Sequence, residues 1–215
     1  MQALLVINFI DCLRKQGMKL FSFGKFIAIV LILLTSMSKS ASAQTSDAAR
    51  LGMALDYYQG GKYHEAMLLL EKLDQQYKLN PRFRAYLGVC YYYEWDYARA
   101  ATCLDSVIPK LESFSPSERS FYSFAAAESY FYMKEFDKAL SFYQQMLLLC
   151  HDNEKADAFY RIGFIYSLRQ DWIAALDNFQ SSLVYYRRYR PEETARIAQI
   201  RNMIVGCCNE IDAKD

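Results

Sequence analysis

Two histidines, His64 and His151, stand among the residues of this 215-residue chain that could do chemistry. His151 directly follows Cys150, and a cysteine nucleophile needs a histidine base. Neighbouring side chains on a helix point ~100° apart, so these two side chains do not converge on one substrate atom. The pair also lacks an obvious third group to orient the base. The sequence therefore predicts no cysteine–histidine catalytic site.

Acidic pairs are the second candidate for catalysis, because a positioned carboxyl group can act as a general acid or base. Asp47 and Asp56, like Glu192 and Glu193, stand where surface and helix-start charges are expected. The sequence holds no G-x-x-x-x-G-K-[ST], H-E-x-x-H or G-x-S-x-G motif and no glycine-rich phosphate cradle. We therefore expect a protein that is not an enzyme and holds no cofactor.

Five cysteines follow residue 43, and their odd number and irregular spacing argue against a disulfide framework. Two of them fall on the two helices expected in one unit and could meet, but we interpret them as small buried hydrophobes. A bridge between the two adjacent cysteines near the C-terminus would be strained. No cysteine pair has zinc-ligand spacing with a histidine, so no metal site is predicted and the redox state stays open. The five are Cys90, Cys103, Cys150, Cys207 and Cys208.

A recurring pattern organises the elements that would position any site. An aromatic residue is followed by a second aromatic residue six positions later and by an alanine three positions after that. The first two copies are 34 residues apart, and the third and fourth follow at slightly wider spacing. A fixed period in this range marks a repeat array, which usually serves as a binding scaffold. The copies are Tyr57, Tyr63 and Ala66; Tyr91, Tyr97 and Ala100; Tyr130, Phe136 and Ala139; and Tyr166, Trp172 and Ala175.

Each unit is predicted to form two short helices, because apolar residues recur at helical spacing on both sides of a central break. Small residues stand where the two helices should cross, and these let the helix axes approach to ~8–10 Å. Neither helix can bury its apolar stripe alone, so the units must stack. The predicted crossing pairs are Ala54 with Ala66, Gly88 with Ala100, Ala127 with Ala139, and Gly163 with Ala175.

This pattern resembles the tetratricopeptide repeat family, in its secreted bacterial type. The second copy carries the resemblance in the run Leu87-Gly88-Val89-Cys90-Tyr91, and the fourth copy carries it in Ile162-Gly163. The resemblance covers about residues 47–189 and implies an all-α fold, an α-α superhelix of about four helix pairs with a C-terminal capping helix. The tryptophan often found early in the first helix is absent. Arg50, Arg84, Ser123 and Phe159 stand at that position.

The predicted repeats span 47–80, 81–114, 120–153 and 156–189, and the capping helix spans 191–210. Asn80-Pro81 reads as a helix start, and Ser115-Pro116-Ser117-Glu118 reads as a capping box with proline just inside the helix. Pro191-Glu192-Glu193 is predicted to open the last helix, since its acids suit the positive end of the helix dipole. That helix should cover the open apolar end of the array.

The first 43 residues read as a secretory signal peptide. A basic start at Met18 and Lys19 precedes a run of twelve mainly apolar residues over 26–37 and an Ala41-Ser42-Ala43 exit. Cleavage after Ala43 predicts a mature chain of residues 44–215 in the periplasm or outside the cell. A run of twelve residues is shorter than the ~20 apolar residues that span a bilayer, so no stable membrane span is expected after cleavage. An uncleaved anchor is the alternative, and either Met1 or Met18 is the true start.

The charge of the mature chain excludes one class of partner. Residues 44–215 carry 20 basic and 23 acidic residues, a net charge of −3. A nearly neutral domain gives no electrostatic reason to bind nucleic acid. We interpret the local run of Arg187, Arg188 and Arg190 as the solvated end of a helix.

The resemblance implies that the first helices of the units line a concave groove that binds a partner. The exposed face expected for these helices is aromatic and poor in charge, which fits an apolar or aromatic peptide or a helix laid in the groove. The alternative is that these rings pack on neighbouring units or on a second copy. The candidate residues are Tyr58, Tyr92, Tyr93, Phe121, Phe124, Phe131, Tyr132, Tyr160 and Phe164.

The sequence thus favours a non-catalytic protein–protein interaction scaffold, exported to the periplasm or cell envelope. Its partner is a protein or peptide whose identity the sequence leaves open. One alternative is a self-associating structural protein of the envelope, in which the groove closes on a second copy as a homodimer. Another alternative is a surface protein that binds glycans.

Overall fold

The computed structural model describes residues 47–213, and all regular structure in that range is helical. The chain divides into two units, residues 1–50 and 51–215. Of the first unit only residues 47–50 are described. They are helical, and Arg50 donates a hydrogen bond of 2.9 Å to Asp47. The predicted signal peptide, its cleavage site and the two candidate start residues lie outside the described residues.

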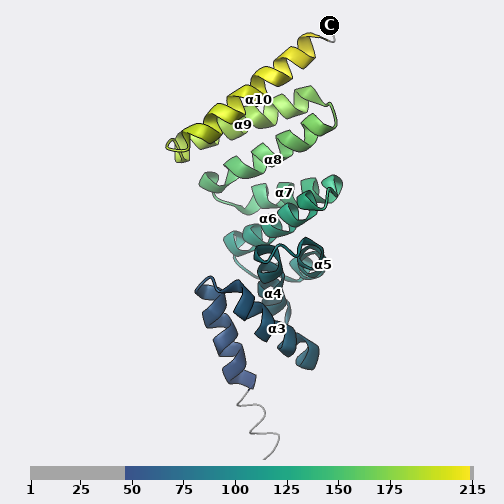
Figure 1. Cartoon of the computed structure of the whole chain (residues 1–215), viewed down its shortest axis with the longest axis vertical. Helices are drawn as coiled ribbons and strands as arrows, with labels where there is room; N and C mark the ends of the chain where they lie inside the picture. The colour runs from purple at the N-terminus through teal and green to yellow at the C-terminus, as the bar shows by residue number, and fades with distance from the viewer. Residues whose placement is uncertain (1–46, 214–215) are drawn as a thin grey trace, which may run out of the picture. The chain divides into compact units, whose positions relative to one another are not determined.

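The second unit is a succession of helices (Figure 1). Residues 51–59 are helical, and each later helix lies against its neighbour in the chain. Two short 3-10 turns, η1 (Ile108–Lys110) and η2 (Asp152–Glu154), lengthen the second and third repeats. The α-helices are α3 (Tyr63–Tyr77), α4 (Pro81–Tyr93), α5 (Tyr97–Val107), α6 (Pro116–Tyr132), α7 (Phe136–Leu149), α8 (Lys155–Leu168), α9 (Trp172–Tyr189) and α10 (Thr194–Asp212).

The core of this unit runs along the stack instead of gathering at one centre. Its buried residues form three clusters that follow the chain, and the last cluster joins α8, α9 and α10. In that last cluster Ile197 and Ile200 of α10 cover Phe179 of α9, so α10 closes the apolar end of the fourth pair. The predicted all-α superhelix of about four helix pairs with a capping helix is confirmed.

Helix starts are fixed by local capping. The side chains of Asn80, Asp96, Ser115 and Asp171 each accept a hydrogen bond from the backbone N–H three residues later, at 3.1–3.2 Å. These caps begin α4, α5, α6 and α9, and each satisfies an N–H group that has no partner within its helix. Proline stands first in α4 and α6, as the sequence predicts.

The last helix starts later than expected. It begins at Thr194 and not at Pro191, and it runs to Asp212. The guanidinium of Arg190 bonds to Glu193 at 3.3 Å and to Asp157 of α8 at 2.9 Å. These contacts hold residues 191–193 in a turn that redirects the chain onto α9.

Two glycines mark the closest helix approaches. A Cβ atom at Gly163 would lie 2.9 Å from the Phe179 ring and 3.2 Å from the Ala175 carbonyl oxygen, which confirms the predicted Gly163–Ala175 crossing. A Cβ atom at Gly88 would lie 2.7 Å from Leu104 Cγ. Gly88 therefore packs on Leu104, the repeat counterpart of the Phe179 that Gly163 meets, so the two crossings are equivalent.

The turn inside each repeat uses one left-handed residue at the same repeat position. The backbone φ angles are 71° at Gly61, 61° at Trp95, 63° at Lys134 and 59° at Gln170. Only the first of these residues is a glycine, which adopts this conformation without strain. A bulky residue with positive φ is uncommon, and the Trp95 side chain is 79% exposed at that turn.

The five cysteines of the described residues are free thiols, so the interpretation of Cys90 and Cys103 as buried hydrophobes is confirmed. Burial raises the pKa of Cys90 to about 12 and that of Cys103 to about 11. The Cys103 thiol also donates a hydrogen bond of 3.1 Å to the carbonyl oxygen of Arg84. Cys207 is buried with a raised pKa, whereas Cys208 is exposed.

These differences predict selective thiol labelling. At pH 8 a thiol reagent is expected to modify Cys208 first, because the thiolate is the reactive species and the raised pKa values keep Cys90 and Cys103 protonated. Counting labelled cysteines by mass spectrometry with and without urea checks this, with Cys208→Ser as the control that removes the fast reaction. Rapid labelling of Cys90 in the folded protein would contradict the packing of α4 against α5.

Candidate partner-binding site

The nine candidate groove residues do not form one surface. Tyr58 is half-buried between Tyr63 and Tyr86, with ring centroids at 5.8 and 4.5 Å. Tyr160 is 8% exposed, packs on Phe179 and lies under the Arg196 guanidinium, so it belongs to the contact with the capping helix. The remaining residues form an aromatic row and a pocket.

The aromatic row runs from the first repeat to the fourth, on helices from α3 to α8. Consecutive ring centroids are 3.9–6.3 Å apart along it, close enough for direct contact between the rings. Five of the nine candidates lie in it, joined by the aromatic residue that begins α3 and the one that begins α5. We call this set the aromatic ladder, and its members in spatial order are Tyr63, Tyr93, Tyr92, Tyr97, Tyr132, Phe131 and Phe164.

Two ladder rings are stacked on a neighbouring tyrosine and remain partly exposed. Tyr93 stacks on Tyr63 with centroids 3.9 Å apart, and Tyr132 stacks on Tyr97 at 4.5 Å. Their exposed fractions are 40% and 49%. They occupy equivalent positions in the second and third repeats, at the last turn of the first helix. The ladder therefore presents rigid aromatic rings to solvent at repeat spacing.

A buried ion pair fixes one end of the ladder. The Arg161 guanidinium of α8 donates two hydrogen bonds of 2.8 Å to the Glu128 carboxylate of α6, and Glu128 also accepts one from the Tyr143 hydroxyl of α7. The guanidinium lies 4.4 Å from the Phe131 ring centroid and donates to the Tyr132 hydroxyl at 3.3 Å. The orientation of both rings thus depends on a contact between repeats.

The electrostatics of this contact follow from its burial. Glu128 is 4% exposed, and only a paired and hydrogen-bonded charge is tolerated there. Burial alone would lower the pKa of Arg161, but its hydrogen bonds and charge interaction with Glu128 outweigh that effect and raise the pKa. Burial, followed by the charge of Glu128, raises the pKa of Tyr143 well above its usual value. The Arg161 guanidinium therefore stays protonated and the Tyr143 hydroxyl stays neutral at neutral pH.

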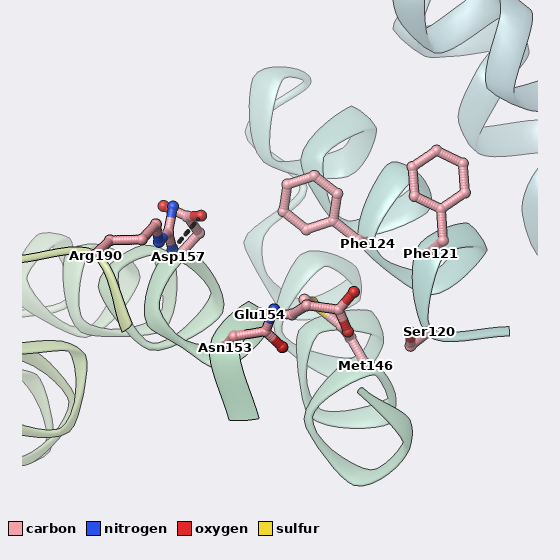
Figure 2. A pocket seen from close by; sticks show the side chains of 8 residues that line it. All are labelled: Ser120, Phe121, Phe124, Met146, Asn153, Glu154, Asp157 and Arg190. Atoms are coloured by element: carbon pink, nitrogen blue, oxygen red, sulfur yellow. Dashed lines mark hydrogen bonds and ion pairs between the residues drawn. The ribbon is translucent and has the colours of Figure 1, made fainter. Parts of the chain in front are cut away.

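The pocket lies between α6 and α8 and has a volume of about 300 Å³. Figure 2 shows Phe121 and Phe124 of α6 on one side and Asp157 with Arg190 on the other. Met146 of α7 adds a flexible apolar surface to the lining. The other lining residues are Ser120, Asn153 and Glu154.

The polar residues that line the pocket form hydrogen bonds with each other and with neighbouring residues of the chain. Asp157 accepts hydrogen bonds from the Tyr186 hydroxyl and, at 2.9 Å, from Arg190. The Arg190 Nε is buried without a hydrogen-bond partner among the described residues. Glu154 accepts a hydrogen bond of 3.0 Å from the backbone N–H of His151. The pocket thus combines an aromatic wall with a polar edge whose charges are largely paired.

Within residues 47–213 no group of histidine, cysteine and acidic side chains is arranged to hold a metal ion. His64 bonds to Glu94 at 2.8 Å on the surface, and His151 is exposed. Among the helices described, none has the length and apolar character needed to cross a bilayer.

Sequence reasoning missed several residues that shape this site. Glu128 and its partner Arg161 stand in different repeats, so no local spacing joins them. The signal was a lone acid after Ala125-Ala126-Ala127, since a buried acid demands a counter-charge. Met146 lines the pocket from α7, and Arg190 lines it from the residue after α9, so neither stands on a first helix.

Comparison with known proteins supports the fold. No protein-family model matches the sequence, and no curated protein matches it. A solved MamA mutant structure is similar with a TM-score of 0.61 at 15% identity, covering 79% of this chain and 90% of that one. A Podosopora anserina putative kinesin light chain with nearly identical TPR-like repeats has a TM-score of 0.55 at 12% identity, covering 77% of this chain and 86% of that one.

A third solved structure is the C-terminal part of a TPR repeat-containing protein from Cytophaga hutchinsonii. Its TM-score is 0.55 at 14% identity, and the match covers 74% of this chain and 61% of that one. Identities this low show the fold alone. The chain therefore has the tetratricopeptide-repeat-like fold that its sequence pattern predicts.

Proposed function

We propose that this protein is a non-catalytic interaction scaffold that binds an apolar or aromatic segment of a partner protein across α4, α6 and α8. The observation that carries the proposal is the aromatic ladder with its half-exposed rings, Tyr93 and Tyr132. Exposed apolar surface of this kind marks interaction sites. Rigid aromatic side chains are also the residues that most often dominate binding energy.

The pocket supplies the second part of the proposed site. Its volume of about 300 Å³ is at the lower end of the ~300–1,000 Å³ typical of ligand pockets. It therefore suits one large apolar side chain of the partner instead of a whole small molecule. Phe121 and Phe124 would pack against that side chain, and Met146 would adapt to its shape.

The charges around the ladder favour an uncharged partner segment. Arg161 is already neutralised by Glu128, so it offers the partner a cation face and not a free charge. A partner carboxylate placed there would compete with Glu128 and leave one acid buried without a counter-charge, which is costly. A partner tyrosine or leucine side chain would instead extend the ring stack.

The decisive test compares two pairs of exposed apolar residues. A Tyr93→Ala/Tyr132→Ala variant is expected to stay folded by circular dichroism and to lose its partner, since each aromatic anchor typically contributes ~2 kcal/mol, about thirtyfold in affinity. The control Ile173→Ala/Val184→Ala truncates residues of α9 that are 66% and 61% exposed and should leave binding unchanged. Partner recovery from the native cell envelope, followed by affinity measurement with the purified partner, gives the readout.

Self-association is an outcome of the same experiment. If the ladder closes on a second copy, light scattering after size exclusion would show a dimer that the tyrosine variant dissociates and the α9 control does not. Binding that survives the loss of both tyrosines, with the fold intact, would overturn the proposed site.

Export is a separate part of the proposal and rests on the sequence of residues 1–43. Protein recovered from a secreting host is expected to begin at Gln44, because the Ala41-Ser42-Ala43 exit precedes it. Amino-terminal sequencing checks this. A mature, membrane-bound form that begins at Met1 or Met18 would favour the anchored alternative.

A further inference from the structure

A second cavity, separate from the pocket of Figure 2, lies among the end of α5 with η1, the start of α6 and the end of α7. Its volume is about 210 Å³. Two polar atoms of its lining residues, Arg119 Nε and Ser123 Oγ, are buried and have no hydrogen-bond partner among residues 47–213. Buried polar groups are nearly always bonded, so a pair of unsatisfied donors at one cavity indicates a missing acceptor. The lining is Ile108, Arg119, Ser123, Gln145, Leu148 and Leu149.

Among residues 47–213, Ser123 is the serine whose hydroxyl is buried without a hydrogen-bond partner. Ser123 is 1% exposed, so water has little access to it. Five other helical serines each donate to the carbonyl oxygen three or four residues earlier, at 2.7–2.9 Å. Ser123 makes no such bond. The five are Ser106, Ser120, Ser129, Ser167 and Ser181.

The second repeat has a carboxylate at the corresponding place. There Arg84 stands at the repeat position of Ser123, and its Nε lies 3.6 Å from a carboxylate oxygen of Asp74, an ion pair without a hydrogen bond. Both residues line a cavity of about 410 Å³. The counterpart of Asp74 one repeat later is Ile108. The carboxylate that pairs with Arg84 in the second repeat is therefore replaced by the apolar side chain of Ile108 in the third.

The fourth repeat fills the same place. Phe159 stands at the position of Ser123 and stacks on Tyr185, with centroids 5.6 Å apart. At this position the second repeat has a charged side chain with an ion-pair partner, and the fourth repeat has an aromatic ring that occupies the space. In the third repeat Ser123 leaves it hollow and lined by hydrogen-bond donors.

The lining defines the chemistry of the missing ligand. Arg119, Ser123 and Gln145 all offer donors, and no carboxylate lines the cavity. A guanidinium binds a planar carboxylate through two parallel hydrogen bonds. The remaining wall is aliphatic, and Leu148 is 86% exposed at its rim. A volume of about 210 Å³ is below the ~300–1,000 Å³ of ordinary ligand pockets, so only a short acid or the end of a longer chain fits.

We propose that this cavity binds an aliphatic carboxylate. The carboxylate accepts hydrogen bonds from Arg119 and Ser123, and its aliphatic portion packs on Ile108, Leu148 and Leu149. The ligand is either a short free acid or the terminal carboxylate of a peptide whose last side chain is aliphatic. This site does not depend on the aromatic ladder, and its ligand does not compete for the pocket of Figure 2.

The test uses N-acetyl-leucine as the probe and N-acetyl-leucinamide as its neutral counterpart. The purified full chain, with labelled isoleucine and leucine methyl groups, is titrated with each and followed by NMR. The acid is expected to shift the methyl signals of Ile108, Leu148 and Leu149 and to bind about tenfold or more tightly than the amide, since a hydrogen bond to a charged group is lost in the amide.

Three variants test the assigned contacts. Arg119→Gln is expected to weaken binding of the acid about tenfold or more and to abolish the preference over the amide. Ser123→Ala should weaken it less, without any change of bulk that could disturb the fold. Arg187→Gln removes an exposed cation of α9 and should leave the affinity unchanged.

Two results would overturn the proposal. Equal binding of acid and amide would show an apolar hollow without anion recognition, and the absence of any methyl shift up to the solubility of the probe would show that water alone satisfies Ser123 and Arg119. Hexanoate and a leucine-terminated tetrapeptide then identify the source. Tighter binding of the tetrapeptide indicates a chain terminus, whereas tighter binding of hexanoate indicates a free acid.

Discussion

Replacing Gly163 with alanine is expected to lower the free energy of unfolding by about 1–3 kcal/mol, the range seen when a packed core is overfilled. The added Cβ would lie 2.9 Å from the Phe179 ring and 3.2 Å from the Ala175 carbonyl oxygen. Phe179 is fully buried, and the carbonyl belongs to the α9 backbone, so neither can move without separating α8 from α9. Urea unfolding followed by circular dichroism measures the effect.

Gly206 provides the matched control for this prediction. It lies inside α10 and is exposed, and a Cβ there would meet nothing within 4 Å. Gly206→Ala should therefore raise stability by about 0.5–1 kcal/mol, because alanine restricts the unfolded chain and favours the helix. The same substitution is thus expected to change sign between the two sites. Equal effects would mean that the register of α8 on α9 is wrong.

Removing Glu128 is expected to be the most destabilising single change. Glu128→Ala should cost about 3–5 kcal/mol, since it leaves the largely buried Arg161 guanidinium without its counter-charge and the Tyr143 hydroxyl without its acceptor. The matched control is Asp137→Ala, which removes a 94% exposed carboxylate bonded to Arg169 at 2.7 Å. That surface pair should contribute only about 0–1 kcal/mol. Urea melts of both variants give the comparison.

A double variant separates the cost of a lost pair from the cost of an orphaned charge. Glu128→Leu/Arg161→Met should recover much of the stability that Glu128→Ala loses, because replacing a buried ion pair with apolar residues is often neutral. The variant would still lose the guanidinium that lies 4.4 Å from the Phe131 ring centroid and bonds to Tyr132. A variant that regains stability without partner binding would show that the ion pair positions the aromatic ladder. If the double variant is as unstable as Glu128→Ala, the orphaned charge is not the cause.

The confirmed predictions rest on interactions between residues close in the sequence. The helix pairs follow from apolar residues at helical spacing, and the starts of α4 and α6 follow from Asn80-Pro81 and Ser115-Pro116, whose caps bond three residues ahead. The repeat pattern itself then requires stacking, since a single pair leaves an apolar face open. For these features the physical cause and its sequence signal lie within one turn of helix.

Other features depend on how one helix is rotated and shifted against the next. That rotation brings Gly88 against Leu104. It buries Tyr160 beneath the capping helix and leaves Tyr132 partly exposed. It also brings Arg161 within hydrogen-bond distance of Glu128, 33 residues away in the sequence. It depends on many side-chain volumes at once and on the extra turns η1 and η2, so no local spacing encodes it.

The candidate site likewise has one part that the sequence predicts and another that only the tertiary structure shows. From its sequence alone this protein is an all-helical repeat array with an aromatic face on its first helices. Only the tertiary structure decided which of those rings stack into a ladder, which line a pocket, and which donors meet at Ser123 without an acceptor. Contacts within a helix recur every three or four residues and are visible in the sequence, whereas contacts between repeats form only when the whole stack has packed.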